Sequence, residues 1–352
     1  HLHTIFASTA RKAPCVRFER VLLKTADDGR LALDILREWP VCEDCIPERR
    51  TEQNPNQWLL LVSGLGGGSE DSYVQSMCAS AANRGWNVAV LNMRGCGNSP
   101  ITSPRFFSAM RGSVDDMRQA VSYMRTYLRD EDSSEPMVVA AGGWSNGATI
   151  VNNYAALQET DASYGPAHRI DLAATLCCPF DMPAADRGFR RPFSKLVYDR
   201  ALTRKLISKI RENTEVFQKM QPVSISGKPI DLDLEKLLNA RTVREIDAEL
   251  TIKSFEYPTV DAYYADSSSE QRLADIQIPT IMISALDDPL IPDGGIPESQ
   301  IISNDDLMLV TTKHGGHLGW VEANSADNEK RWCPEWTESV VLNFLEQLRN
   351  RR

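Results

Sequence analysis

Histidine is scarce in this sequence, and positive charge is in deficit. The 352 residues include five histidines, none in an H-E-x-x-H pattern, so a zincin-type metalloprotease is not supported. Lys and Arg number 39 against 48 Asp and Glu, which gives a net charge of −9 at pH 7. A dedicated nucleic-acid-binding protein is usually basic, so we expect no nucleic-acid partner. No apolar run approaches the roughly 18 residues that a membrane span needs.

The cysteines form no metal-binding or disulfide pattern. There are eight, and an even number in a chain of this length does not establish disulfides. Cys42 and Cys45 make a single C-x-x-C, whereas zinc would need two further ligands at a matching spacing. We expect this pair to be structural or incidental, with a labile disulfide as the alternative, and we expect no metal or cofactor.

The composition is that of an ordinary globular protein with a large core, with 42% hydrophobic and 25% charged residues. The sequence begins with His1 instead of Met, so an upstream signal, transit segment or anchor could be missing. We therefore expect a soluble domain and leave its compartment open, with membrane association and a missing upstream segment as alternatives.

Short apolar runs alternate with amphipathic segments from Trp58 onward, which is typical of a mostly parallel sheet with helices on both faces. A hairpin with a turn at Asp27-Asp28-Gly29 precedes them. The predicted strands are residues 16–24, 31–39, 59–63, 87–92, 137–141, 172–177, 280–284 and 307–311. The predicted helices are residues 71–83, 114–128, 146–157 and 335–348.

Residues 181–274 interrupt this alternation. The segment looks mostly helical, contains no convincing strand and lies between two predicted strands of the sheet. We therefore expect an α/β fold in which a core of residues 1–180 and 275–352 carries an inserted, mainly helical cap of residues 181–274.

A candidate nucleophile stands in Gly143-Trp144-Ser145-Asn146-Gly147, which fits G-x-S-x-G. An apolar strand precedes the motif and a helix follows it, which is the strand–turn–helix setting of a nucleophile elbow. Glycines at both ends would avoid clashes across the tight turn, and the helix N-terminus offers free N–H groups to developing negative charge. The alternative is a glycine-rich turn with a passive serine.

A serine nucleophile needs a histidine base and a carboxylate that orients it, in the chain order serine, acid, histidine. Asp287 and Asp288 follow the strand at 280–284, and we choose Asp288 with Asp287 as the alternative. His314 and His317 follow the strand at 307–311. We choose His317, because two glycines precede it and allow the loop to bring the imidazole over Ser145.

A glycine-rich loop follows the first buried strand, at residues 64–69. It has no Gly-Lys-Ser/Thr ending and does not meet G-x-G-x-x-G, so a phosphate-binding loop is not supported. We interpret it as an oxyanion loop in which the backbone N–H of Leu65 joins that of Asn146. Such a donor contributes on the order of 3 kcal/mol to stabilising the tetrahedral intermediate.

Several segments occur together in an order that resembles one family. They are Gly64-Leu65-Gly66-Gly67-Gly68-Ser69, Asn92-Met93-Arg94-Gly95-Cys96-Gly97, Gly143-Trp144-Ser145-Asn146-Gly147, Ala285-Leu286-Asp287-Asp288-Pro289 and Gly315-Gly316-His317-Leu318-Gly319. The chain resembles the α/β-hydrolase subfamily of ABHD-type lipid esterases, plant embryogenesis-associated hydrolases and yeast medium-chain ethyl-ester synthases. Its opening His1-Leu2-His3-Thr4 is similar to the His-Leu-Gln-Thr that opens that family's domain.

The resemblance implies an α/β-hydrolase fold, a triad of Ser145, Asp288 and His317, and esterase or acylglycerol-lipase activity. The chain departs from the family at Ser63, where a histidine is common, and its oxyanion loop is longer. The H-x-x-x-x-D motif proposed for acyl transfer in some relatives is absent.

We therefore expect a serine hydrolase of carboxylic esters, of lipid or acylglycerol type, that forms an acyl-enzyme on Ser145. An alcohol O-acyltransferase with the same triad is the alternative, and a hydrolase-fold binding protein with little turnover is the second alternative.

The predicted cap reverses the acidic balance of the chain locally. Its basic residues are Arg187, Arg190, Arg191, Lys195, Arg200, Arg204, Lys205, Lys209 and Arg211, with Phe189, Phe193, Leu196, Val197 and Tyr198 between them. Such a basic, apolar face could contact an anionic membrane and deliver lipid esters to the serine. The alternative is a solvated basic helix that pairs with acids elsewhere.

Overall fold

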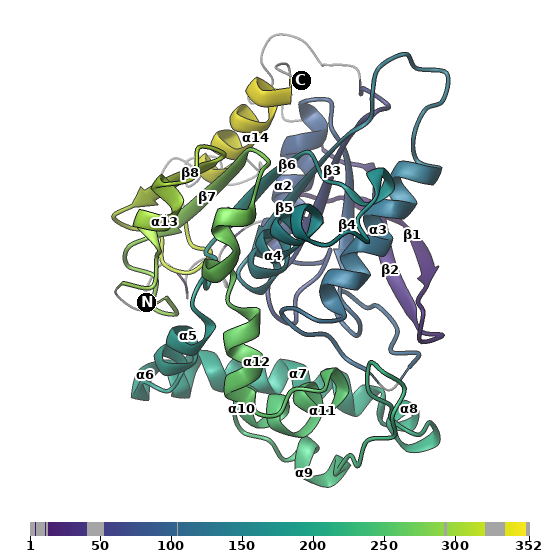
Figure 1. Cartoon of the computed structure of the whole chain (residues 1–352), viewed down its shortest axis with the longest axis vertical. Coiled ribbons are helices and arrows are strands. Elements are labelled where there is room, and N and C mark those ends of the chain that lie inside the picture. The colour runs from purple at the N-terminus through teal and green to yellow at the C-terminus, as the bar shows by residue number, and fades with distance from the viewer. Residues whose placement is uncertain are drawn as a thin grey trace.

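The computed structural model describes Thr4, Arg11 and residues 13–40, 53–103, 105–291, 294–320 and 335–349. Within these residues one sheet has the strand order β1-β2-β4-β3-β5-β6-β7-β8 (Figure 1). Its strands are β1 (Arg17–Lys24), β2 (Arg30–Glu38), β3 (Gln57–Val62), β4 (Asn87–Asn92), β5 (Val138–Trp144), β6 (Leu172–Leu176), β7 (Thr280–Ala285) and β8 (Leu307–Thr312). Every strand predicted from the sequence is present, and the mostly parallel α/β sheet is confirmed.

The strands from β4 to β8 in the sheet order run parallel to one another, and the hairpin β1–β2 joins β4 in antiparallel fashion. The interior strands β3 and β7 are buried along their whole length. This is the pattern of strands that helices cover on both faces, because neither face meets water.

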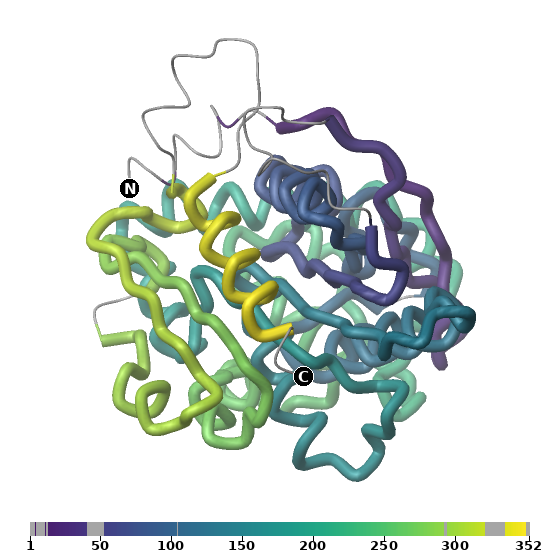
Figure 2. The backbone as a smooth tube through the Cα atoms, turned by 90° about the horizontal axis from the view of Figure 1, so that it is seen from above, coloured from purple at the N-terminus to yellow at the C-terminus, as the bar shows by residue number. Residues whose placement is uncertain are grey.

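Helices cover the two faces of the sheet. Successive side chains of a strand point to opposite faces, so Leu59 and Leu61 of β3 join one hydrophobic cluster and Leu60 and Val62 join another. The first cluster contains side chains of α2 (Ser72–Asn83) and α14 (Trp336–Arg349), which lie side by side (Figure 2). The second contains side chains of α3 (Ser113–Tyr127) and α4 (Asn146–Thr160). Because helices pack on both faces, the strands and the loops that follow them are held at fixed positions.

Strand β5 continues to Trp144, three residues beyond the predicted end at residue 141. Gly142 and Gly143 remain in register with Ala174 and Thr175 of β6. The shorter prediction was wrong because glycine usually weakens a strand. Here the backbone of α4 passes so close that a Cβ on Gly143 would lie 2.5 Å from the carbonyl oxygen of Gly147.

The chain between β6 and β7 is mostly helical. It forms α5 (Met182–Phe189), α6 (Pro192–Ser194), η3 (Lys195–Asp199), α7 (Arg200–Glu212), α8 (Thr214–Lys219), α9 (Leu234–Leu238), α10 (Val243–Ile246), η4 (Asp247–Thr251), α11 (Ile252–Phe255), α12 (Val260–Ser267) and η5 (Ser269–Asp275). The helices up to α12 gather below the sheet in Figure 1, and Leu206, Ile210 and Leu250 join the hydrophobic cluster of α3 and α4. The division into a core and an inserted cap of residues 181–274 stays a prediction.

A short helix, α13 (Glu298–Ile302), precedes β8, and α14 follows the last described loop. Across the described ranges, every helix is too short or too polar to span a bilayer.

Glu338 of α14 is a buried acid against α2. The Ser80 hydroxyl donates a hydrogen bond to its Oε2 at 2.6 Å, and the backbone N–H of Glu335 donates to the same oxygen at 3.1 Å. Burial raises the pKa of Glu338 from 4.5 to about 7, since the charged form loses its hydration.

We expect Glu338→Gln to stabilise the protein above pH 7 and not at pH 4.5. The raised pKa means that the folded state favours the protonated acid, so the free energy of unfolding falls as pH rises from about 4.5 to about 7. The loss is on the order of 3 kcal/mol, and a neutral glutamine avoids it. Urea unfolding between pH 4.5 and 8 measures this, with Glu19→Gln on exposed β1 as the control. Parallel pH profiles of the wild type and Glu338→Gln would contradict it.

Candidate active site

Ser145 occupies a strained turn between β5 and α4. Its φ of 52° lies in the left-handed region, which non-glycine residues rarely adopt. The turn is held from both sides, since Ser145 N–H donates to the Leu176 carbonyl at 2.9 Å and its own carbonyl accepts from Thr149 N–H at 3.1 Å. The helix begins at the next residue, Asn146. This is the local geometry that the G-x-S-x-G motif predicts.

Glycine is required at position 147 by close backbone packing. A Cβ there would lie 2.2 Å from the Val62 carbonyl oxygen and 2.5 Å from that of Ser63. Because both neighbours are main-chain atoms of β3 and its loop, neither can move aside cheaply. The glycine therefore lets α4 start directly against the sheet, with Ser145 at its N-terminus.

Asp288 and His317 form a buried hydrogen-bonded pair. They lie in the loops after β7 and β8, and Asp288 Oδ2 is 2.7 Å from His317 Nδ1. The carboxylate is fixed because its Oδ1 accepts from Leu290 N–H at 2.8 Å and from Ile291 N–H at 3.4 Å. The two side chains are 0% and 8% exposed, so little water competes for the bond. The structure thus brings together the acid and the histidine chosen from the sequence.

The two alternative residues pair with each other instead. His314 Nδ1 is 3.6 Å from Asp287 Oδ2, and Asp287 Oδ1 accepts from Gly316 N–H at 2.7 Å. The His314 side chain is 63% exposed. Neither residue lines the cavity above Ser145. The two adjacent aspartates therefore pair with two different histidines of one loop, Asp287 with His314 and Asp288 with His317.

The predicted oxyanion donors Leu65 and Asn146 both line that cavity. The loop that carries Leu65 is braced by Tyr73, whose hydroxyl accepts from Gly64 N–H at 3.0 Å and donates to Asp71 Oδ2 at 2.9 Å. Asp71 Oδ2 also accepts from Gly68 N–H at 3.0 Å. Sequence reasoning missed Tyr73 and Asp71, because a single tyrosine in a helix carries no motif that links it to the loop.

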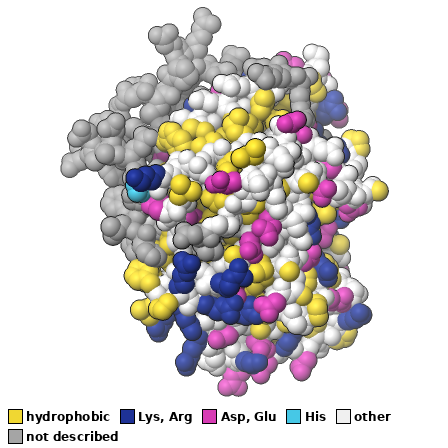
Figure 3. All heavy atoms as spheres, turned by 60° about the vertical axis from the view of Figure 1, so that its left-hand side comes forward, with side chains coloured by type: hydrophobic (Ala, Val, Ile, Leu, Met, Phe, Trp, Pro, Cys, Tyr) yellow, Lys and Arg dark blue, Asp and Glu magenta, His cyan; other side chains and the backbone are white. Residues whose placement is uncertain are grey.

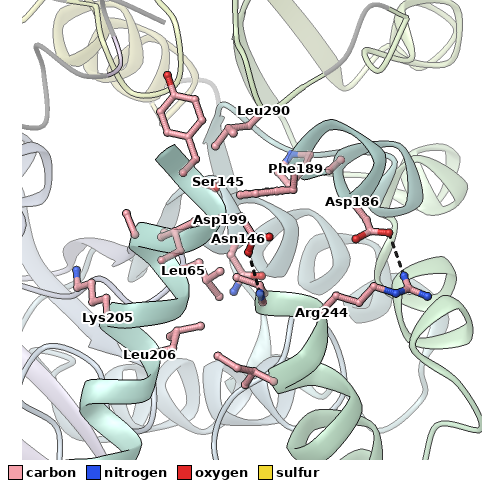
Figure 4. Close-up of a pocket in the computed structure, with 18 of the residues that line it drawn as sticks. Leu65, Ser145, Asn146, Asp186, Phe189, Asp199, Lys205, Leu206, Arg244 and Leu290 are labelled. Carbon is pink, nitrogen blue, oxygen red and sulfur yellow. Dashed lines mark hydrogen bonds and ion pairs between the residues drawn. The ribbon is translucent and has the colours of Figure 1, made fainter. Parts of the chain in front are cut away.

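A cavity of about 910 Å³ lies over Ser145 and is lined by both the strand-end loops and the helices of residues 182–264 (Figure 4). His317, Leu65 and Asn146 line it, and Figure 4 shows Phe189, Leu206 and Arg244 on the helices around it. Its large apolar lining side chains are Leu65, Phe106, Phe107, Met182, Phe189, Val197, Leu202, Leu206, Val243, Ile246, Val260, Leu290 and Leu318. A cavity of this size and character fits an apolar ligand of many carbon atoms.

Several charged groups in the cavity wall are paired or hydrogen-bonded. Asp186 Oδ2 is 2.9 Å from an Arg244 nitrogen, an ion pair that joins α5 to α10. Asp247 accepts hydrogen bonds from Tyr264 at 2.8 Å and Thr251 at 2.7 Å. Burial raises the pKa of Asp247 to about 6, so this part of the wall loses its charge in mild acid. No sequence motif marks these residues.

Cys177 completes the surroundings of the Asp288–His317 pair. Its Sγ and one ligand atom each of Asp288 and His317 lie within 4.8 Å of one another. The three donors fit a metal poorly, because Asp288 and His317 already bind each other and burial raises the pKa of the Cys177 thiol well above its usual range. Sγ instead accepts from Leu318 N–H at 3.3 Å.

Some residues singled out in the sequence fall outside the described residues. They are His1, Leu2, His3, Cys42 and Cys45. Ser63, which replaces a common histidine, is buried, and its hydroxyl has no hydrogen-bond partner in the described part of the chain.

Comparisons with known proteins give the family. A sequence model of the family described as alpha/beta hydrolase fold matches residues 57–323. Embryogenesis-associated protein EMB8 of Picea glauca is 35% identical over 350 residues, which cover 99% of this chain and 70% of that protein. Phospholipase ABHD3 of Homo sapiens is 26% identical over 309 residues, with 88% and 68% covered.

A monoacylglycerol lipase of Saccharomyces cerevisiae is 30% identical over 284 residues, which cover 79% of this chain and 57% of that protein. Among solved structures, the Pyrococcus furiosus esterase Pf2001 matches with a TM-score of 0.54 at 13% identity, covering 94% of this chain and 91% of that one. That likeness concerns the fold alone. The chain therefore belongs to the α/β-hydrolase family and, within it, to the subfamily of ABHD-type proteins.

Proposed function

We propose that this protein is a serine hydrolase that cleaves carboxylic esters of lipid or acylglycerol type. The observation that carries the proposal is that Ser145, in its strained turn, and His317, which is hydrogen-bonded to the buried Asp288, line one largely apolar cavity. Relatives named as a phospholipase and a monoacylglycerol lipase support ester hydrolysis. The nucleophile and the covalent intermediate are the parts of the proposal that need testing.

In the proposed reaction, the Ser145 hydroxyl attacks the ester carbonyl while His317 Nε2 takes its proton. Asp288 keeps the proton of His317 on Nδ1, which leaves Nε2 free to accept. The N–H groups of Leu65 and Asn146 bind the oxyanion. His317 then gives its proton to the leaving alkoxide, and the alcohol departs from an acyl-serine. Water attacks this acyl group through the same histidine and releases the acid and free Ser145.

The apolar lining supports an acyl chain as the bound part of the substrate. Burying a hydrocarbon chain contributes about 0.8 kcal/mol per CH₂, so an extended chain would supply much of the binding energy. The cavity is shared between the strand-end loops and α5, α7, α10 and α12, which would enclose the chain and keep water from it.

Labelling with an alkyl fluorophosphonate tests the nucleophile. We expect one equivalent of probe per chain, mapped by peptide mass spectrometry to Ser145, and a hydrolysis rate that falls in step with labelling. A label on another residue, or no labelling of folded protein that hydrolyses esters, would contradict the proposal. Folded protein that neither reacts nor turns over a range of esters would favour a binding protein.

Transfer of the acyl group to an alcohol is the second candidate reaction, and it needs only an alcohol in place of water. Incubation of one ester substrate with graded ethanol separates the two by the ratio of ethyl ester to free acid. A ratio set by the ethanol concentration alone indicates a hydrolase, whereas excess ethyl ester at low ethanol indicates an acyltransferase.

We also propose that one face of the cap, the basic-apolar face, contacts anionic membranes. Its exposed residues are Arg187, Arg190, Arg191, Phe193, Lys195, Leu196, Arg200, Arg204, Lys205 and Arg211. Phe193 and Leu196 are 47% and 64% exposed. Figure 3 shows Lys and Arg side chains gathered beside hydrophobic ones in the lower part of this side of the molecule. Lys195 and Lys205 also line the cavity, so the face adjoins the substrate site.

We expect the double variant Arg200→Glu, Arg204→Glu to bind anionic vesicles at least tenfold more weakly than the wild type. Each basic residue near an anionic surface contributes about 1 kcal/mol, and reversal adds repulsion. Co-sedimentation with phosphatidylserine-containing and pure phosphatidylcholine vesicles measures it, with exposed Arg129→Glu as the control. Equal binding of the wild type to both vesicles, or none, would contradict membrane contact by charge.

A further inference from the structure

Thr4 contacts the backbone of the residue proposed as the catalytic base. The N–H of His317 donates a hydrogen bond to Thr4 Oγ1 at 2.8 Å, across 313 residues of sequence. Thr4 also lines the cavity over Ser145. A residue near the start of the sequence is therefore part of the wall of the active site.

Arg11 binds the same loop at Leu318, the residue after His317. Its guanidinium donates to the Leu318 carbonyl at 2.7 Å and to both carboxylate oxygens of Glu335, at 2.6 and 2.9 Å. The Arg11 side chain is only 7% exposed. Because Glu335 immediately precedes α14, the guanidinium links the histidine loop to a helix that packs on the sheet.

The histidine loop needs such restraints because its backbone is strained. Leu318 has a φ of 64°, in the left-handed region that non-glycine residues rarely adopt. Its N–H donates to Cys177 Sγ, while its carbonyl accepts from Arg11. Asp288 fixes only the ring of His317. The backbone that carries the ring is held instead by Thr4, Arg11 and Cys177, together with Asp287, which accepts from Gly316 N–H.

Thr4 also touches the other wall of the cavity. Its side chain lies close to the phenol of Tyr198, which belongs to η3 between β6 and β7. Tyr198 lines the cavity as well. Thr4 therefore lies between the histidine loop and the helical layer on the other side of the cavity.

We propose that Thr4 and Arg11 are positioning residues for His317, so that two residues some 300 positions away in the sequence support the active site. The inference rests on the proposed hydrolase function. A hydroxyl at position 4 and a guanidinium at position 11 hold the backbone of the loop that places His317 in the cavity over Ser145. Neither group takes a proton or touches the reacting atoms.

Thr4→Val tests the hydroxyl, since valine keeps the shape and removes the acceptor. We expect kcat to fall about 10- to 100-fold with KM within about twofold, because a small misplacement of a catalytic group costs up to about 10²-fold in rate. Thr4→Ser restores the hydroxyl and should recover most of the rate. Thr160→Val, which changes an exposed threonine at the end of α4, should leave both constants unchanged.

Arg11→Met tests the guanidinium, with Arg17→Met as its control. Arg17 is paired with Glu38 on the exposed hairpin, so its loss removes an ion pair without touching the loop. We expect the rate of fluorophosphonate acylation to fall at least tenfold in folded Arg11→Met and to stay unchanged in Arg17→Met. Thermal melting of each variant shows whether it is folded at the assay temperature.

The outcomes separate the inference from the proposed function. An active wild type with Thr4→Val and Arg11→Met at wild-type kcat would overturn the inference and leave the function standing. Loss of rate in Thr4→Ser as severe as in Thr4→Val would also overturn it, because the hydroxyl would not be the cause. A folded wild type without labelling or turnover would instead overturn the proposed function.

Discussion

Asp288→Asn and Ser145→Ala are expected to give the largest losses of activity, and Ser145→Ala should lower ester hydrolysis by a factor of about 10⁴ to 10⁶. Without the hydroxyl no acyl-enzyme forms, and the remaining rate comes from substrate binding and oxyanion stabilisation alone. The fold should persist, because the strained turn is held by main-chain bonds from Ser145 to Leu176 and Thr149 that alanine retains.

The initial rate of hydrolysis of a medium-chain ester measures this effect. Protein concentration is determined from absorbance, so that it does not depend on the active site. Ser284→Ala is a matched control, since it removes a buried hydroxyl of β7 that has no hydrogen-bond partner among the described residues. It should keep a rate within a few-fold of the wild type. A Ser145→Ala protein that is folded and retains a tenth of the activity would rule out a covalent mechanism at this residue.

Asp288→Asn should lower kcat by about 10³ to 10⁴ while changing KM little. Asparagine preserves the shape and can still accept from Leu290 N–H. Its amide, however, can donate to His317 Nδ1, which drives the ring proton to Nε2. The imidazole then cannot accept the Ser145 proton, and no carboxylate stabilises the imidazolium that forms.

Asp287→Asn is the matched control for this effect. It makes the same chemical change one residue earlier, where the carboxylate meets His314 and Gly316 N–H instead of His317. We expect its kcat within about fivefold of the wild type, since the asparagine oxygen can still accept from Gly316 N–H and the side chain does not touch His317. If Asp287→Asn is the damaging variant, the assignment of the acid is reversed.

The double variant Ser145→Ala, Asp288→Asn adds a further check. Residues that act as one unit are strongly non-additive, so the double variant should be no slower than Ser145→Ala alone. A further loss of 10³ or more would mean that Asp288 works outside the relay, for example in substrate binding.

Much of the fold follows from local sequence signals. The strands and the helices of the core are predicted within a few residues, because apolar runs and 3.6-residue periodicity report burial directly. The elbow at Ser145 is equally local, since strand, turn and helix are adjacent in the chain. The end of β5 was missed because the glycine at position 143 allows close packing against α4. Strand propensities do not account for such packing.

The choice between the two aspartates and between the two histidines depended on the tertiary structure. Two aspartates and two histidines of similar sequence context sort into a buried pair, Asp288–His317, and an exposed pair, Asp287–His314. Their surroundings differ because Asp288 accepts hydrogen bonds from Leu290 N–H and Ile291 N–H. Asp287 accepts one from Gly316 N–H instead. Such differences arise from how two loops meet.

The sequence by itself determined the α/β architecture, the serine at the elbow and the loops that carry the proposed acid and base. Only the folded chain decided which acid meets which histidine, that Tyr73 braces the glycine-rich loop, and that Thr4 and Arg11 reach the backbone beside His317. The physical reason is distance along the chain. Periodicity and turn chemistry act over a few residues, whereas a hydrogen bond between residues 313 positions apart exists only once the sheet has brought them together.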